Sequence, residues 1–138
     1  MTKGKMIKWG VLCTAILFAA AVILFWTPPG RTYTLTLPEA GKLESIQLTQ
    51  GTDTAAVGDM GMLLELLTGT ERKTRSESIQ DCPVNAENVV QIDFRFKEQG
   101  TSTVFVYQKG RSFFIEQPYN GVYRISEEEF REIEGMLL

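Results

Sequence analysis

The strongest constraint on this chain is an uninterrupted apolar run over residues 9–26, WGVLCTAILFAAAVILFW. The run carries no charge, and its only hydroxyl group belongs to Thr14. An α-helix of this length spans roughly 27 Å, close to the roughly 30 Å hydrocarbon core of a bilayer. Trp9 and Trp26 stand at its ends, where indole rings favour the membrane–water interfaces. We therefore predict a transmembrane helix over residues 9–26, followed by a linker over residues 27–30.

The charges that flank this run predict its orientation. Three lysines within residues 1–8 precede the run, whereas Arg31 is the one basic residue just behind it. Because positive charge is retained on the cytoplasmic side, we expect residues 1–8 in the cytoplasm and residues 27–138 outside the cell membrane. A cleaved signal peptide is the alternative, since an A-x-A site ends at Ala21. The apolar run continues beyond that site, which favours an uncleaved signal anchor.

The segment behind the predicted anchor is acidic and contains no histidine. It holds 11 Lys and Arg against 17 Asp and Glu, a net charge of −6. Proteins that bind nucleic acid usually present a basic face, so we exclude nucleic acid as a partner. The lack of histidine removes imidazole bases, Ser–His and Cys–His pairs, and histidine metal ligands.

Alternating sequence patterns predict four antiparallel strands in the second half of the domain. Residues 89–97 alternate between apolar and polar side chains, which is typical of a half-buried strand. Residues 102–108 are apolar on both faces, so we expect this strand at the centre of the sheet. Residues 112–117 and 122–125 follow after short turns that contain glycine. The four segments predict an antiparallel meander.

The first half predicts two further strands and a helix. Residues 32–37 alternate as a half-buried strand, and residues 43–49 form a second strand. Residues 60–67 carry methionine and leucine at helical spacing. Asp59 is the expected N-cap of this helix, and Gly69 is the expected stop.

The segment over residues 68–88 shows no strong periodicity. A stretch of this length without structure is uncommon in a compact domain, so we expect either a functional loop or a hidden strand at residues 75–81. The basic sequence RKTR at residues 72–75 is interpreted as a solvated loop. Contact with an anionic lipid or a wall polymer is the alternative.

The C-terminal residues predict a second helix and complete the fold class. Ser126 and Glu129 form a capping box, and Phe130 and Ile133 share one helical face. We predict an α+β protein in which a single N-terminal transmembrane helix precedes an extracytoplasmic domain over residues 31–138. In that domain an antiparallel sheet of about six strands packs with two helices.

Two segments of the domain resemble a known family. These are SESIQDCPVNAENVVQIDFRF at residues 76–96 and SFFIEQPYNGVYRISEEEF at residues 112–130. They resemble an uncharacterised family of small envelope proteins of Gram-positive bacteria, a domain of unknown function with a K-T-x-x-S-x-x-D-x-P stretch and an IEQPY-x-G-x-Y block. The chain has serine at both 76 and 78 where the pattern has one. The resemblance implies lipoproteins, single-pass proteins or outer domains of larger membrane proteins, and it brings no activity and no catalytic residues.

The residues offer little for catalysis or metal binding. A glycosidase needs two carboxyl groups across a cleft, and the chain offers Asp81, Asp93, Glu116 and residues 127–129, of which Asp81 and Glu116 would carry the hydrolase hypothesis. Asp81 precedes Cys82 and Pro83 in a turn where aspartate often bonds its own backbone. The outer domain has one thiol and no histidine, which disfavours zinc and copper, and the chain has no calcium-loop or glycine-rich phosphate motif. We predict no catalytic residue, no metal and no cofactor.

Cys82, the only thiol of the outer domain, has two interpretations. The first is a small buried residue without a chemical role. The second is a disulfide between two chains, since an odd cysteine can pair in this way in an oxidising compartment.

The block over residues 113–123 is the best functional candidate, because it places four aromatic residues around a turn. Tyr119 follows a proline in that turn and is difficult to bury there, and tyrosine suits recognition surfaces. Alternatively, Glu116 and Gln117 bond the loop at residues 74–83 and simply hold the fold. The candidate interaction surface consists of Thr74, Ser78, Asp81, Glu116, Gln117, Tyr119, Asn120 and Tyr123.

These observations rank three functions. The first is a non-enzymatic interaction or ligand-sensing module, held in the lipid bilayer by residues 9–26, which binds a protein or an envelope ligand. The second is an accessory or regulatory subunit that acts through its transmembrane helix, where small residues such as Gly10 and Thr14 let another helix approach. The last is a carboxylate-based envelope hydrolase.

Overall fold

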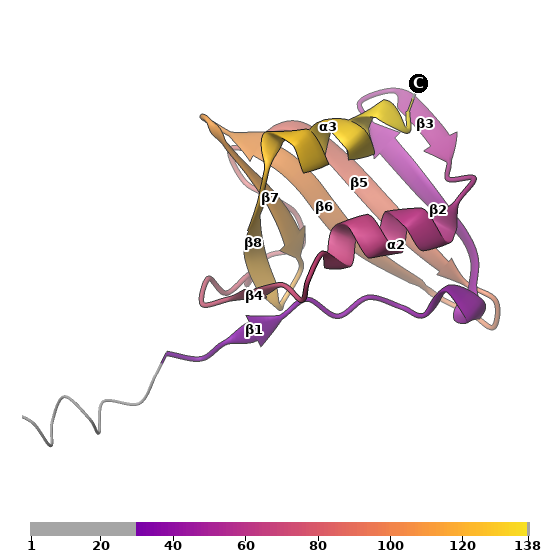
Figure 1. Ribbon diagram of the computed structural model, residues 1–138, viewed down its shortest axis with the longest axis horizontal. Coiled ribbons are helices and arrows are strands. Elements are labelled where there is room, and N and C mark those ends of the chain that lie inside the picture. Colours follow the sequence, from indigo (N-terminus) through magenta and orange to yellow (C-terminus); the bar gives the residue numbers. More distant parts are fainter. Residues whose placement is uncertain (1–29, 138) are drawn as a thin grey trace, which may run out of the picture. The chain divides into compact units, whose positions relative to one another are not determined.

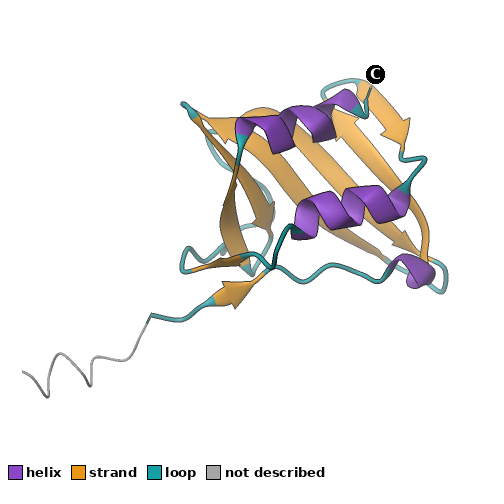
Figure 2. Ribbon diagram, in the orientation of Figure 1, coloured by secondary structure: helices purple, strands orange, loops and turns teal. Residues whose placement is uncertain are grey.

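The computed structural model describes residues 30–137, and these residues form an α+β domain (Figure 1). A six-stranded antiparallel sheet carries two helices on one face, and a two-stranded sheet lies beside it (Figure 2). This confirms the predicted sheet and the two predicted helices. The predicted transmembrane segment at residues 9–26 lies outside the described residues. Among residues 30–137, no helix is long and apolar enough to cross a membrane.

The large sheet has the strand order β3-β2-β5-β6-β7-β8, and the small sheet pairs β1 with β4. Every neighbouring pair is antiparallel, so β5 to β8 form the predicted meander. The elements are β1 (Tyr33–Thr34), the 3-10 helix η1 (Ala40–Lys42), β2 (Leu43–Gln50), β3 (Asp53–Ala56), α2 (Met60–Thr68), β4 (Lys73–Thr74), β5 (Glu87–Phe96), β6 (Thr101–Lys109), β7 (Ser112–Gln117), β8 (Gly121–Ile125) and α3 (Glu127–Gly135).

Both helices begin where the sequence predicts. The side chain of Asp59 accepts a hydrogen bond from the Met62 N–H at 3.0 Å and so caps α2. Gly69 ends α2 in the left-handed region at φ +58°, a conformation that glycine adopts without steric cost. Ser126 and Glu129 form the reciprocal capping box of α3.

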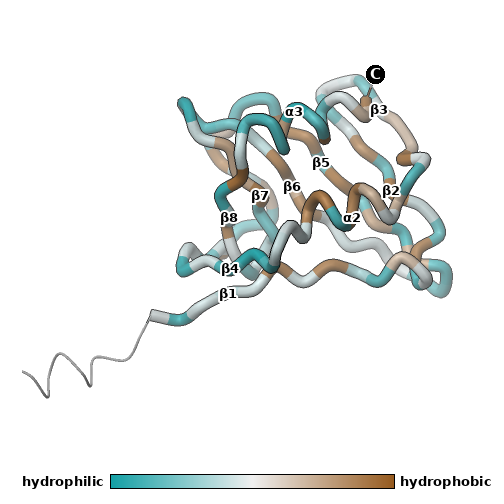
Figure 3. Tube along the Cα trace, viewed as in Figure 1, coloured by the Kyte–Doolittle hydropathy of each residue, from teal (hydrophilic) through white to brown (hydrophobic). Residues whose placement is uncertain are grey.

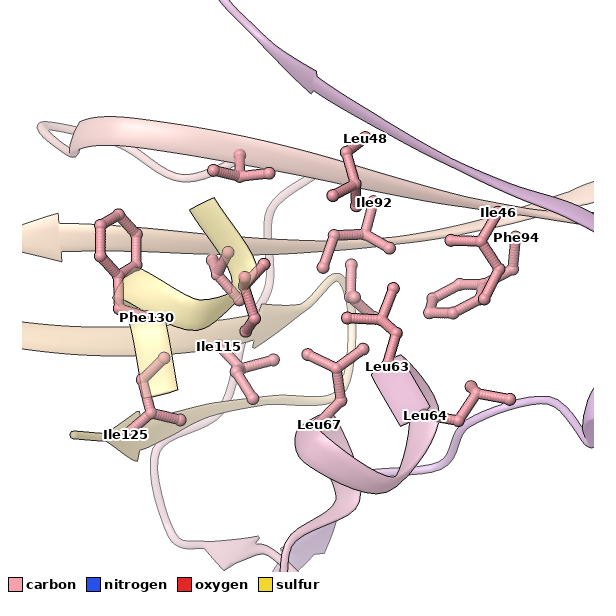
Figure 4. Close-up of a cluster of buried hydrophobic side chains, with 14 of the residues drawn as sticks. Ile46, Leu48, Leu63, Leu64, Leu67, Ile92, Phe94, Ile115, Ile125 and Phe130 are labelled. Carbon is pink, nitrogen blue, oxygen red and sulfur yellow. The ribbon is translucent and has the colours of Figure 1, made fainter. Parts of the chain in front are cut away.

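The two helices bury one shared core against the sheet (Figure 4). Leu63, Leu64 and Leu67 of α2 point toward the sheet, and Phe130 of α3 fills the neighbouring space. Each large apolar side chain buried in this way contributes about 1.5–3 kcal/mol. Hydrophobic residues accordingly run along α2 and the centres of β5 and β6, whereas α3 is mostly hydrophilic (Figure 3).

Strand β6 is covered on both faces, as its sequence predicts. Val104 and Val106 belong to the core under the helices, whereas Phe105 and Tyr107 are buried on the opposite face. That opposite face is covered in part by the segment over residues 75–86, which connects β4 to β5 and which we call the crossing loop. The segment without periodicity therefore covers part of the second face of the sheet.

Near the N-terminus one predicted strand is shorter than expected, and one observed strand lies outside the predictions. Only Tyr33 and Thr34 of residues 32–37 form strand pairs, and they pair with β4 instead of the large sheet. The alternation survives because Leu35 and Leu37 pack against the core while the threonines are exposed. Strand β3 was not predicted, because its short sequence DTAA is mostly exposed and has no apolar alternation.

Of the two alternatives for the aperiodic segment, the hidden strand at residues 75–81 is wrong and the loop is found. Ordered pairing stops with β4 at Thr74, and beyond it the loop makes a single bridge between Glu77 and Gly121. The loop instead uses its side chains, because it crosses the sheet face where Glu116 offers a carboxylate.

Candidate functional site

The crossing loop and the turn between β7 and β8 lie side by side along the edge of the sheet. The Ser78 N–H donates to the Asn120 carbonyl at 3.1 Å, and the Val122 N–H donates to the Ser76 carbonyl at 2.9 Å. The two segments that carry the family resemblance therefore form one unit. We call residues 117–121 the tyrosine turn.

Gln117 and Asn120 tie the tyrosine turn to the N-terminal segment. The Gln117 Nε2 donates to the Thr36 carbonyl at 2.6 Å, and the Thr36 N–H donates to Gln117 Oε1 at 3.1 Å. The Asn120 Nδ2 donates to the Thr34 carbonyl at 2.8 Å and to Gln117 Oε1 at 2.6 Å. These amides supply the hydrogen bonds that a further strand would otherwise provide. Gln117 thus bonds the segment around Thr36 and not the loop at residues 74–83.

The close approach of Thr74 explains why the tyrosine turn ends in a glycine, Gly121. A Cβ atom on Gly121 would lie 2.7 Å from Thr74 Cγ2 and 3.0 Å from the Tyr123 hydroxyl. Only a residue without a side chain lets β4 approach β8 this closely. Tyr123 is buried, which raises the pKa of its hydroxyl to about 12, and that hydroxyl accepts a hydrogen bond from Asn120 Nδ2 at 3.1 Å.

Glu116 is the centre of the contact between the crossing loop and the sheet. Its side chain is 1% exposed. Its Oε2 accepts hydrogen bonds from Ser78 Oγ at 2.9 Å and Gln80 Nε2 at 3.3 Å, and its Oε1 accepts one from the Tyr107 hydroxyl at 2.9 Å. Burial and the bond to Glu116 raise the pKa of Tyr107, so this hydroxyl stays protonated and remains a donor. The carboxylate therefore fastens the loop by two bonds, while the third bond ties it to Tyr107 of β6.

Burial removes three predicted residues from the accessible surface. Ser78 of the crossing loop, Glu116 of β7 and Tyr123 of β8 are all buried, so none of them can contact a partner directly. Their hydrogen bonds correct the expectation of a contact surface, because the polar atoms of these residues are used inside the domain. The alternative in which Glu116 bonds the loop agrees with these contacts.

Tyr119 and Asp81 remain outside and touch each other. The Tyr119 hydroxyl donates to Asp81 Oδ1 at 2.5 Å, and this bond raises the pKa of the tyrosine. Asp81 was expected to bond its own backbone, whereas the structure gives it Tyr119 as a partner. Tyr119 is 66% exposed. Its backbone has φ +59°, in the left-handed region that L-residues with bulky side chains rarely adopt.

The crossing loop adds three exposed residues that lie outside the surface predicted from the sequence. Ile79, Cys82 and Val84 are all exposed. We call these three residues, Asp81 and Tyr119 the tyrosine patch, because all five lie in the crossing loop or in the tyrosine turn that is hydrogen-bonded to it. Large apolar residues in an aperiodic loop were the available signal for Ile79 and Val84. The interpretation of Cys82 as a buried residue is wrong, because the loop turns its thiol outward.

The two carboxylates considered for hydrolysis differ in environment. Glu116 is buried under the crossing loop with all its bonds directed to neutral donors of the described residues, whereas Asp81 is exposed beside Tyr119. In residues 30–137, no three His, Cys, Asp or Glu side chains are grouped to hold a metal ion.

The comparisons with known proteins identify one family. A family model named DUF5301, described as "Domain of unknown function (DUF5300)", matches residues 31–124. The match includes the crossing loop and the tyrosine turn and ends before α3. No curated protein and no solved structure matches the chain.

Proposed function

The chain belongs to the DUF5301 family, a domain of unknown function, and from this premise we propose that it is a membrane-anchored extracytoplasmic module without catalytic activity. Its role is to bind a protein partner through the tyrosine patch. Residues 9–26 hold it in the lipid bilayer, residues 1–8 lie in the cytoplasm, and the domain over residues 31–138 faces the envelope of a Gram-positive bacterium.

The conformation of Tyr119 is the observation that carries this proposal. A left-handed backbone costs an L-residue about 1–2 kcal/mol, and glycine would avoid that cost. A ring that is 66% exposed gains little from burial in return. The bond to Asp81 holds the ring in one orientation on the surface. A rigid, exposed aromatic residue is what a binding hot spot requires, and strained residues gather at functional sites.

The neighbours of Tyr119 support the same surface. Within residues 30–137, four large hydrophobic side chains are exposed, and three of them are Ile79, Val84 and Tyr119. The fourth, Met62, lies on α2. These three lie in the crossing loop and the tyrosine turn, which bond to each other, and exposed apolar side chains confined to one region mark interaction sites more often than scattered ones do. The apolar character favours a protein partner, because the patch offers few groups for a strongly polar ligand.

Thiol labelling tests the proposed location. We expect a membrane-impermeant maleimide to label Cys82 on intact cells, because this thiol is exposed on a domain that we place outside. Cys13 should stay unlabelled, since it falls within the proposed anchor. The Cys82→Ser variant, which must lose the label, is the matched control. Labelling that appears only after the cells are lysed would show that the domain faces the cytoplasm.

Photo-crosslinking tests the proposed surface. A crosslinker at Tyr119 is expected to capture one partner in cells, whereas a crosslinker at Gln99, in the exposed turn between β5 and β6, captures none. Tyr119→Gly should weaken binding of that partner by about tenfold or more, the range of a hot-spot residue. Glycine tolerates φ +59°, so the thermal midpoint should not fall.

Three results would count against this function. Equal capture at Tyr119 and Gln99 would show that the tyrosine patch is not the binding surface. If Tyr119→Gly binds the captured partner as tightly as the wild type does, Tyr119 is not a hot-spot residue. Loss of binding when residues 9–26 are replaced by an unrelated anchor, with the domain folded and outside, would favour the accessory subunit that acts through its helix.

A further inference from the structure

A second exposed apolar surface lies between the two helices, on the face of the sheet opposite to the crossing loop. Met62 and Leu66 of α2 and Met136 at the end of α3 line an open hollow of about 270 Å³. Met62 is 51% exposed, and the other two are half-buried. We call this hollow the helix groove. It is separate from the tyrosine patch and has no role in the function proposed above.

The groove exists because each helix packs on the sheet instead of on the other helix. α2 turns Leu63 and Leu67 toward the sheet, and α3 turns Phe130 and Ile133 toward it. Arg72, which follows α2 and donates to the Leu66 and Leu67 carbonyls of that helix, forms an ion pair with Glu129 of α3. The remaining space between them keeps an apolar floor that the domain itself leaves uncovered.

The sides of the helix groove are acidic. Glu65 of α2 and Glu132 of α3 line it, and both are exposed. Glu128, one turn before Glu132, is exposed as well. The nearest cation on α3, Arg131, already pairs with Glu127 and Glu134. Among residues 30–137, Glu65, Glu128 and Glu132 have no ion-pair partner.

We propose that the helix groove binds a basic amphipathic helix of a partner protein. Apolar side chains spaced one helical turn apart would pack on Met62, Leu66 and Met136, and flanking lysine or arginine side chains would pair with Glu65 and Glu132. Methionine suits such a groove, because its flexible and polarizable side chain adapts to different apolar partners. The negative charge of Glu65 and Glu132 favours this occupant over two others. It repels an anionic lipid surface, and it repels the same acidic face of a second copy of the chain.

Methyl NMR of the full-length chain tests this proposal. The protein, with ¹³C-labelled methionine methyl groups, is placed in nanodiscs of zwitterionic lipid, or in buffer if it does not insert. The probe is a synthetic amphipathic peptide of leucine and lysine with helical periodicity. We expect the methyl signals of Met62 and Met136 to shift on titration, whereas Met60, which packs against the core, shifts little.

Charge variants provide the matched control. The double variant Glu65→Lys/Glu132→Lys should weaken binding of the peptide by about tenfold or more, since it reverses both charges beside the groove. Glu44→Lys/Glu87→Lys changes the net charge equally at exposed positions on β2 and β5 and should bind as the wild type does. Tyr119→Gly should also bind normally, so this proposal and the tyrosine patch can fail separately.

Three outcomes would overturn the proposal. The first is the absence of shifts at Met62 and Met136. The second is an equal response to a peptide of the same composition with a scrambled order, which would reduce the effect to charge alone. The third is a shift of both signals with protein concentration in the absence of peptide, which would place a second copy in the groove.

Discussion

Glu116→Ala is expected to lower the free energy of unfolding by about 3–4 kcal/mol, one of the two largest effects that we predict. The substitution leaves three donors without their acceptor: Ser78 Oγ, Gln80 Nε2 and the Tyr107 hydroxyl. An unpaired buried polar group costs about 1–3 kcal/mol, and part of that cost is recovered where water enters. Urea unfolding of the full-length protein, followed by circular dichroism, measures the change.

Glu116→Gln is the matched control for this experiment. It keeps the shape and one acceptor oxygen of the side chain, so we expect a loss of about half that size. Hydrogen exchange provides a local measurement, because the Ser78 N–H is bonded to the Asn120 carbonyl and should lose protection when the loop detaches. If Glu116→Ala retains both its unfolding free energy and the protection of Ser78, the carboxylate does not fasten the loop.

Arg72→Ala is expected to cost about 2–4 kcal/mol in unfolding free energy. The Arg72 Nε donates to the Leu67 carbonyl at 2.6 Å, and its Nη2 donates to the Leu66 carbonyl at 3.2 Å. The guanidinium therefore supplies hydrogen bonds to carbonyl groups at the end of α2, which have no partners within the helix. The same group forms an ion pair with Glu129 at the start of α3. Arg72→Lys is the control, and it should recover only part of the loss because an ammonium cannot make all three contacts.

The ion pair of Arg72 also predicts how stability depends on pH. Burial opposes ionisation of Glu129, but the bonds from Arg72 and Ser126 outweigh it, so the pKa of Glu129 is lowered from its ordinary value of 4.5. The unfolded chain then binds this proton more readily than the folded chain does. The stabilisation is full above the unfolded pKa and is lost as the pH falls through the folded pKa.

Thermal unfolding between pH 6 and pH 3 should therefore separate two single variants. Glu129→Gln is expected to lose less stability on acidification than the wild type, because it lacks the group that titrates. Glu128→Gln, at the exposed neighbouring position, should follow the wild type. Parallel curves for Glu129→Gln and the wild type would contradict a lowered pKa at Glu129.

Arg72 thus differs from the solvated residue that the sequence indicated, because the end of α2 and Glu129 hold it largely buried.

The most regular parts of the fold could be predicted from the sequence. Alternation over residues 89–97 and the doubly apolar residues 102–108 specify which faces are buried, and burial of those faces selects the pairing of β5 with β6. Capping signals at Asp59 and Ser126 placed both helix starts. These signals act within a few residues of one another, so they can be recognised without a tertiary structure.

The candidate site was predicted only in part, because its contacts join residues far apart in the chain. Tyr119 was expected to be exposed and is exposed, since a turn offers no core to cover its ring. Glu116 and Ser78 were expected near a surface, but they are buried together although 38 positions separate them. Neither periodicity nor composition indicates that an aperiodic loop will cross that face of the sheet.

The sequence by itself determined the apolar segment at residues 9–26, the α+β class and the order of the four strands of the meander, because each depends on local hydrophobic patterning. The tertiary structure alone decided that Glu116 fastens the crossing loop, that Gly121 admits Thr74, and that Cys82 faces outward. The physical reason is that hydrogen bonds and close packing between distant segments form only once the chain has folded. The exposed surface that we propose for binding is therefore a product of those long-range contacts.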